Sequence, residues 1–493
     1  MNRIFTSFFV FFLTAASLPA QSPLKFDDYF VDRTMRIDYF HIGDSKEEWI
    51  TIDQIYEQGI WAGSLRNLLD KFDNGRYYAK VYDLSSGRLI FSKGLDSYFG
   101  EYKTTGQALR GLKRTYHETI LIPYPKRKIK FTLEVRNREN ILQLLFSQEV
   151  DPSSISIIKE RSDKGVKVFE ILKSGDPHER VDVAFIAEGY TRKEEGKLKA
   201  DLELFTKVFF NHEPYKTYKA EFNIYGVFKP SDESGCDEPR HGVYKNTAVS
   251  ASFNALGSER YLLTEDNKSL RDIAAHVPYD SLLIMVNQKR YGGGGIYNLY
   301  CTFTVDNQWC EYLFLHEFGH SFAGLGDEYY TSSVAYNEFY PRGVEPTEPN
   351  ITALLDPKSL KWKDLLTPKI DIPTPWEKED FDRMDMAYQK IRREINEKIA
   401  KMKREGAARA EIEKVERESE RLSRDHAKKV DGYFLKSRFR DKVGVFEGAG
   451  YSSKGLYRPM LDCLMFTKGK KPFCKVCEQA VVRVIKHYTG VGS

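Results

Sequence analysis

The first part of the chain alternates apolar and polar positions in short runs that turns separate. Residues 75–94, GRYYAKVYDLSSGRLIFSKG, contain two such runs on either side of a Ser-Ser-Gly turn, which is a hairpin signal. In residues 128–137, KIKFTLEVRN, every second residue is apolar. The pattern predicts an all-β sandwich domain over residues 24–150. Such a domain would support packing and folding or, as an alternative, bind a substrate or surface ligand.

From about residue 175 the pattern changes to strands that alternate with helices. Buried strands are predicted from VDVAFIAEGY, FNIYGVF and SLLIMVN, and a helix from KEEGKLKADLELFTKVFF. This order predicts an α/β domain with a mostly parallel sheet over residues 175–493.

Four consecutive glycines, residues 292–295, follow the last of these strands. A phosphate-binding loop is excluded, because that loop needs a Lys and a Ser or Thr at fixed places. The run is expected to form a rim or strand edge beside a cleft, where an extended substrate could pair through backbone hydrogen bonds, or else an ordinary loop. Gly293 and Gly294 are therefore candidate cleft residues.

Residues 376–430 are dense in Lys, Arg and Glu and predict a helical hairpin. Apolar residues step by four and three along this segment, with an interruption at Gly406. They are Met384, Tyr388, Ile391, Ile395, Ile399, Met402, Ile412, Val415 and Leu422. The stripe is narrow, so we expect one arm to pack on the other and the hairpin to project into solvent. It could contact a partner or serve as a spacer.

Length, charge and the N-terminus narrow the class of protein. A chain of 493 residues predicts two or three domains, and a net charge of +4 without a basic stripe argues against nucleic acid as a partner. Residues 1–20, MNRIFTSFFVFFLTAASLPA, are typical of a signal peptide. No later stretch is apolar enough for stable membrane insertion. We expect export to a periplasm, the cell surface or the extracellular space.

Residues 316–330, HEFGHSFAGLGDEYY, carry the strongest chemical signal. His316 and His320 are four residues apart, so on a helix both imidazoles leave the same face and can bind one zinc ion. The carboxylate of Glu317 could hold a water molecule and remove its proton as a general base. A helix with two surface histidines is the plain alternative.

Zinc needs a third protein ligand, and Asp327 is the economical choice. Gly324 and Gly326 let the helix end in a left-handed turn and the chain double back before this Asp. The region after it, residues 331–350, is rich in turn signals and poorly suited to a helix that could supply a Glu. Glu328 is the runner-up, and one of the two acids could orient a ligand instead.

The segment HEFGHSFAGLGDEY resembles the bacterial immunoglobulin A metallopeptidase family, which is of the metzincin type. Five further segments are similar to that family and occur in its order: VDVAFIAEGYT, FNIYGVFKPSDESGCDEP, IMVNQKRYGGGG, YRPMLDCLM and FCKVC. The chain departs from the commonest metzincin pattern at Ala323, where those peptidases carry Gly. Its acidic third ligand also replaces a His and comes one residue late.

The resemblance implies a zincin-like catalytic domain that hydrolyses peptide bonds of protein or peptide substrates with a zinc-activated water. By the same resemblance the zinc ligands would be His316, His320 and Asp327, with Glu317 as the base. Met465 would form the methionine turn beneath the metal, and Met460 is the alternative. The helical hairpin would be an insertion in this domain.

Four tyrosines are candidates for holding the oxyanion: Tyr329, Tyr330, Tyr451 and Tyr457. His241 could line the cleft, although a lone His is more often structural.

All six cysteines fall within the catalytic region, and an exported protein favours structural disulfides or buried thiols over a second zinc site.

Two other functions stay open. The first is an adhesion or glycan-interaction protein with a structural zinc site, which a fourth protein ligand would close and which would not need Glu317. The second is a zinc amidase that acts on cell-wall peptides.

Overall fold

The computed structural model describes residues 23–159, 165–332, 334–337 and 339–491. The signal peptide predicted over residues 1–20 lies outside them. Among the described helices, none combines the length and the apolar character that crossing a bilayer requires.

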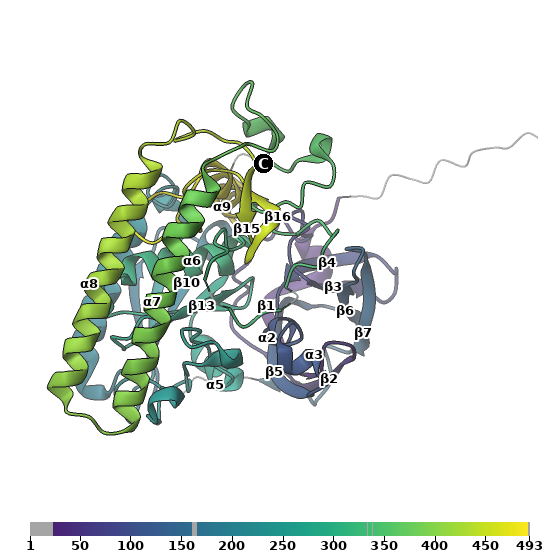
Figure 1. The fold of residues 1–493 in the computed structure, drawn as a ribbon. Helices are drawn as coiled ribbons and strands as arrows, with labels where there is room; N and C mark the ends of the chain where they lie inside the picture. Colours follow the sequence, from purple (N-terminus) through teal and green to yellow (C-terminus); the bar gives the residue numbers. More distant parts are fainter. Residues whose placement is uncertain (1–22, 160–164, 333, 338, 492–493) are drawn as a thin grey trace, which may run out of the picture.

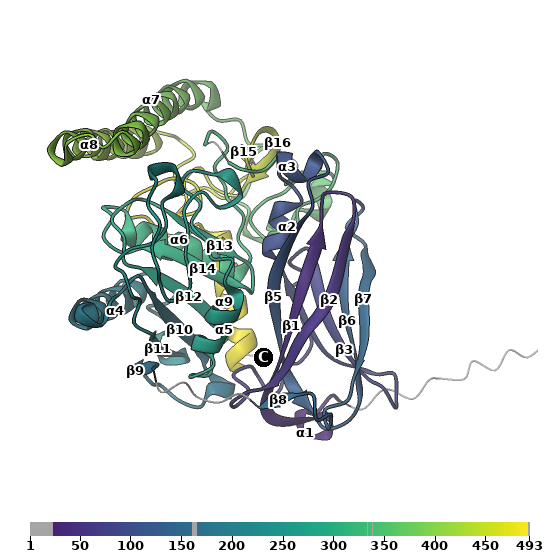
Figure 2. The same ribbon diagram turned by 90° about the horizontal axis from the view of Figure 1, so that it is seen from below.

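The N-terminal region is rich in β structure, as predicted, and contains two four-stranded sheets (Figure 2). Their strand orders are β5-β1-β2-β8 and β4-β3-β6-β7. The strands are β1 (Phe30–Gly43), β2 (Glu48–Glu57), β3 (Tyr77–Asp83), β4 (Leu89–Leu95), β5 (Arg114–Pro125), β6 (Ile129–Arg136), β7 (Leu142–Val150) and β8 (Ile158–Lys159). The predicted hairpin is confirmed as β3 and β4, and one apolar core contains residues of both sheets.

Three short helices accompany these sheets: α1 (Phe26–Tyr29), α2 (Tyr98–Tyr102) and α3 (Gly106–Leu109). Ser97 and Thr105 cap α2 and α3, because their side chains accept hydrogen bonds from the backbone N–H groups of Gly100 and Ala108. The aromatic side chains of α2 pack into a core that also contains residues of the second half of the chain.

A six-stranded sheet organises that second half, in the order β13-β14-β12-β10-β11-β9. The strands are β9 (Lys167–Leu172), β10 (Val181–Glu188), β11 (Phe222–Phe228), β12 (Ser281–Val286), β13 (Gly293–Ile296) and β14 (Tyr300–Thr304). The four central strands run parallel and both edge strands antiparallel, so the sheet is mixed. The predicted strands β10, β11 and β12 are confirmed. Strand β9 lies before residue 175, where the α/β domain was expected to start. Its residues are exposed or half-exposed, so its apolar pattern is too weak to predict a strand.

Helices cover both faces of this sheet. Successive side chains of a strand point to opposite faces. Accordingly, Val183 and Phe185 pack with α4 (Glu195–Phe210) and α6 (Cys310–Ala323), against which α9 (Lys475–Thr489) also lies. Ala184 and Ile186 pack with α5 (Asn267–Ala274) and with α2 of the N-terminal region. The N-terminal region therefore completes the cover of the sheet and is not a separate appendage.

The predicted hairpin is present as the antiparallel helices α7 (Lys378–Arg404) and α8 (Arg409–Phe434) (Figure 1). It does not project freely into solvent as expected, since polar groups bind it to the rest of the protein. Arg404 donates to the carbonyl of Arg240 at 2.8 Å, and the indole of Trp309 donates to Ser423 at 3.1 Å. A partner contact through the hairpin stays a prediction. After it come the paired strands β15 (Phe446–Ala449) and β16 (Ser452–Arg458).

Candidate active site

The two histidines and Glu317 lie on α6, a helix whose residues are nearly all buried. The helix follows β14 and packs against β13 and β14. It ends at Gly324, which has the left-handed conformation expected from the sequence (φ 61°, ψ 32°). This turn sends the chain back across the end of the helix and brings Asp327 to the histidines.

Three donor atoms meet at this point. His316 Nε2 and His320 Nε2 are 3.1 Å apart, and Asp327 Oδ1 lies 3.1 Å and 3.2 Å from them. A tetrahedral zinc ion with ligand bonds of about 2.0–2.1 Å separates its ligand atoms by about 3.3 Å. Asp327 Oδ1 is buried and lacks a hydrogen-bond donor among the described residues. The donor set therefore fits a metal ion between the three side chains.

The opposite ring nitrogens fix the orientation of both imidazoles. His316 Nδ1 lies 3.1 Å from the carbonyl oxygen of Leu464, and His320 Nδ1 lies 2.5 Å from that of Leu325. A backbone carbonyl accepts only from a protonated Nδ1, which leaves the lone pair of Nε2 for a metal. Tyr451 donates to Asp327 Oδ2 at 2.6 Å and so holds this carboxylate with Oδ1 toward the histidines.

The two carboxylates of the site differ in proton affinity. Burial disfavours the ionised form of Asp327, but the positive charge that His320 and His316 carry when they are protonated outweighs this effect and holds the pKa of Asp327 well below the usual range. Burial raises the pKa of Glu317, although the same imidazoles partly oppose the rise. Asp327 is thus suited to remain an anionic ligand and Glu317 to accept a proton.

Glu328, the other candidate for the third ligand, points away from the histidines. Its Oε1 accepts a hydrogen bond from Asn350 at 3.0 Å and lies 3.3 Å from Cys477 Sγ. The geometry therefore favours Asp327.

Met465 lies directly beneath α6. A Cβ atom built on Gly319, the residue before His320, would have Met465 Sδ as its nearest neighbour at 3.1 Å. Met465 is fully buried, and its carbonyl accepts a hydrogen bond from the backbone of Glu328 at 2.9 Å. Met460 is only partly buried. Of the two methionines, Met465 is the one that packs against the helix that carries the histidines.

A cavity of about 640 Å³ opens over the donor atoms. Of the four candidate tyrosines, Tyr329 and Tyr451 line it. The expectation that Tyr457 lies in the cleft is wrong, because Tyr457 does not line this cavity: it is partly buried and packs against the main apolar core. Tyr330 lies outside the lining and donates to Asp382 on α7.

His241 is also outside this cavity and is bonded to Glu238, which agrees with a structural role.

The glycine run forms the edge strand β13 and not a loop. Gly293 and Gly294 both line the cavity. A Cβ on Gly293 would lie 3.0 Å from Glu317 Oε1, so glycine is needed where β13 approaches the helix. The expected pairing of an extended substrate is blocked at Gly293, because its N–H and C=O groups already bond to Arg260 and Leu262. The strand edge was one of the two expectations for this run, and glycines carry no strand signal that could have favoured it over a loop.

Two functional candidates were missed. Glu101, from α2 of the N-terminal region, lines the cavity and accepts hydrogen bonds from Tyr261 and Tyr336. Burial raises its pKa to about 7. Arg260 donates to the hydroxyl of Tyr329 at 2.9 Å. Neither residue has a local sequence signal, because each reaches the site only through tertiary packing.

Replacing Gly295 by Ala should destabilise the protein. The added Cβ would lie 2.4 Å from the carbonyl oxygen of Glu317 and 2.8 Å from His320 Cβ, so the backbone must shift. We expect a loss of about 1–3 kcal/mol in the free energy of unfolding, measured by urea denaturation. Gly196→Ala, at an exposed position of α4 with open space around it, is the control and should cause no loss. Equal stability of Gly295→Ala and wild type would contradict the close packing of β13 on α6.

Two family models match the chain. The IgA Peptidase M64 model matches residues 169–485, which contain α6, the central sheet and the hairpin, and the Peptidase M64 N-terminus model matches residues 25–147. A comparison with curated proteins gave no match. The first model alone covers more than half of the 493 residues. The chain therefore belongs to the IgA Peptidase M64 family of peptidases.

Proposed function

We propose that this peptidase is a zinc-dependent endopeptidase that cleaves protein substrates outside the cytoplasm. One observation carries the proposal: His316, His320 and Asp327 converge on one point in the wall of the cavity, with Glu317 beside them. The signal peptide expected over residues 1–20 supports export.

The residues of the site divide the chemistry of hydrolysis between them. The three ligands would hold a zinc ion, which would supply a Lewis acid to polarise the scissile carbonyl and lower the pKa of water. Glu317 takes the proton of the attacking water and passes it to the leaving amine, for which its raised pKa is suited. Tyr329, held by Arg260, is the candidate donor to the oxyanion.

The surroundings of the site support a metzincin-type arrangement. The sheet with a parallel centre, the active-site helix that ends at Gly324, and Met465 beneath it agree with that class. The two N-terminal sheets with a common core support a β-sandwich. We propose that this sandwich also takes part in substrate binding, because residues such as Arg76 and Glu101 line the cavity.

The other functions are less well supported. A structural zinc site in an adhesion protein would be closed by protein ligands, whereas these three donors face a cavity. The family match favours a peptidase over an amidase of cell-wall peptides.

Removal of metal should abolish cleavage of a mixed pool of unfolded proteins. After dialysis against a chelator we expect no internal cleavage products by mass spectrometry, because Glu317 alone cannot activate the carbonyl. Stoichiometric zinc should restore cleavage, and magnesium should not, since imidazole ligands favour zinc. Cleavage that persists in protein shown to be metal-free would contradict the proposal.

A further inference from the structure

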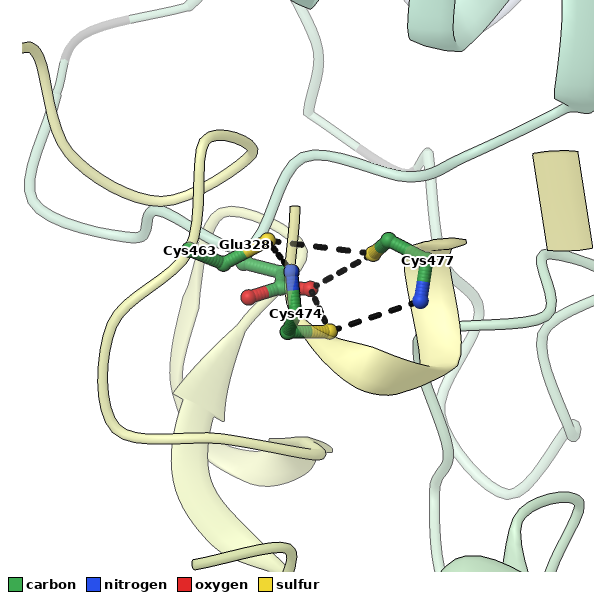
Figure 3. Close-up of side chains that lie close together, drawn as sticks. All are labelled: Glu328, Cys463, Cys474 and Cys477. Atoms are coloured by element: carbon green, nitrogen blue, oxygen red, sulfur yellow. Dashed lines mark hydrogen bonds between the residues drawn. The ribbon is translucent and has the colours of Figure 1, made fainter. Parts of the chain in front are cut away.

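A second group of side chains has the composition to hold a metal ion (Figure 3). It consists of Glu328, Cys463, Cys474 and Cys477, all buried, with ligand atoms within 4.8 Å of one another. All six cysteines of the chain belong to the described residues, and each is a free thiol. The expected disulfides are therefore not formed, while the expectation of buried thiols is confirmed for every cysteine except the half-buried Cys310.

The distances in this group match those between the ligands of one zinc ion. Zinc–sulfur bonds of about 2.3 Å with tetrahedral angles place two sulfurs about 3.8 Å apart, and a sulfur and a carboxylate oxygen about 3.5 Å apart. Cys463 Sγ and Cys477 Sγ are 3.8 Å apart. Glu328 Oε1 lies 3.3 Å from Cys477 Sγ and 3.9 Å from Cys474 Sγ. The sulfurs at 3.8 Å are too far apart for a disulfide bond of about 2.05 Å.

Backbone N–H groups point at the sulfurs, as they do around metal-bound thiolates. Cys463 Sγ accepts from the N–H of Cys474 at 3.1 Å and from that of Met465 at 3.4 Å. Cys474 Sγ accepts from the N–H of Cys477 at 3.4 Å, at the start of α9. Such bonds orient and stabilise anionic ligands. They hold the sulfurs of Cys463 and Cys474 in place from two separate segments of the chain.

Glu328 places a buried carboxylate among the three cysteines, which a simple cluster of thiols does not explain. Its side chain is fully buried, and its Oε2 has no hydrogen-bond partner among the described residues. Burying a carboxylate is costly unless its charge is compensated, and a metal ion bound through Oε1, the oxygen that faces the sulfurs, would compensate it. Asn350 fixes the carboxylate through Oε1, with the sulfurs of Cys474 and Cys477 around it.

We propose that Cys463, Cys474, Cys477 and Glu328 bind a second zinc ion that is structural. Four protein ligands close the site, which leaves no position for a substrate or a reactive water. Thiolate ligands select zinc over magnesium or calcium.

This second site would position the parts of the first. Asp327 and Glu328 are neighbours in the chain and would bind the catalytic and the structural ion, respectively. On the other segment, Cys463 precedes Leu464, whose carbonyl orients His316, and Met465, which lies beneath α6. A structural zinc would therefore clamp both segments at the point where they support the catalytic ligands.

Zinc content per chain, measured by mass spectrometry of the metal, tests the proposal on the full chain. We expect two zinc ions in wild type, and one after His316→Ala with His320→Ala. We expect one also after Cys477→Ser. Cys310→Ser, which alters a half-buried cysteine outside the group, is the matched control and should keep both ions. If wild type bound one zinc ion and the double His variant bound none, the second site would be ruled out. The proposed function would still stand.

Cobalt substitution of the double His variant keeps the proposal testable even if Cys477→Ser does not fold. Cobalt bound by three thiolates gives strong sulfur-to-metal charge-transfer absorption in the near ultraviolet, which ligands without sulfur do not give. We expect this absorption in the double His variant and release of its zinc when a mercurial reagent modifies three thiols. Absence of the absorption would overturn the second site. So would a thiol titration of the denatured, unreduced protein that finds four thiols instead of six.

Discussion

Replacing Glu317 by Gln should lower kcat for peptide cleavage by roughly 10²- to 10⁴-fold, the usual contribution of a general base. The amide keeps the size of the side chain between α6 and Gly293 but cannot accept the proton of the attacking water. Because Glu317 is not among the three proposed ligands, the zinc content should equal that of wild type. Initial rates on a quenched fluorescent peptide, together with metal analysis of the same sample, measure both effects.

Glu311→Gln is the matched control for this variant. Glu311 lies on the same helix and forms a surface ion pair with Lys470 at 3.1 Å. Exposed pairs of this kind contribute about 0–1 kcal/mol, so activity and zinc content should stay close to wild type. If Glu317→Gln retained wild-type kcat, Glu317 would not be the base.

Replacing Asp327 by Ala should remove one zinc ion and abolish cleavage, with a loss of activity at least as large as that of Glu317→Gln. The variant loses the Oδ1 atom that faces both histidines. Two imidazoles alone are an incomplete ligand set for catalytic zinc. Metal analysis after gel filtration in metal-free buffer, together with the peptide assay, gives the result.

Two further variants separate the roles around Asp327. Tyr451→Phe removes only the hydrogen bond to Oδ2, so metal affinity or activity should fall by about 10- to 100-fold, the usual effect of a residue that orients a ligand. Glu328→Gln should leave the catalytic ion in place, because this side chain points toward the cysteines. If Asp327→Ala kept the zinc content and the activity of wild type, Asp327 would not be a zinc ligand.

The sequence was most informative where the chain is buried on both sides. All eight residues of β10 are buried, and a continuous apolar run is the signal of such a strand. The helix with His316 and Glu317 could be identified for a similar reason, because its apolar residues surround a short polar motif of fixed spacing.

Features that depend on close backbone approach or on distant contacts could not be predicted. The glycines of β13 fit against α6 because they lack side chains. Without side chains they show none of the apolar alternation from which a strand is predicted. Glu101 enters the cavity only because the N-terminal region packs on the central sheet. The group around Cys463 joins three separate places in the chain, so the CxxC motif alone could not distinguish a metal site from a disulfide.

The hairpin of α7 and α8 has a consequence for chain entropy. Its two ends meet, since the rings of Phe381 and Phe434 stack with centroids 5.2 Å apart. The contact between His316 and Leu464 closes a loop across 148 residues. Loop closure costs only about 0.6 kcal/mol more for each doubling of length, and the hairpin makes up less than half of this loop. The number of residues between the histidines and Met465 can therefore change at little cost in free energy, so sequence distance is a poor guide to which methionine lies beneath the metal.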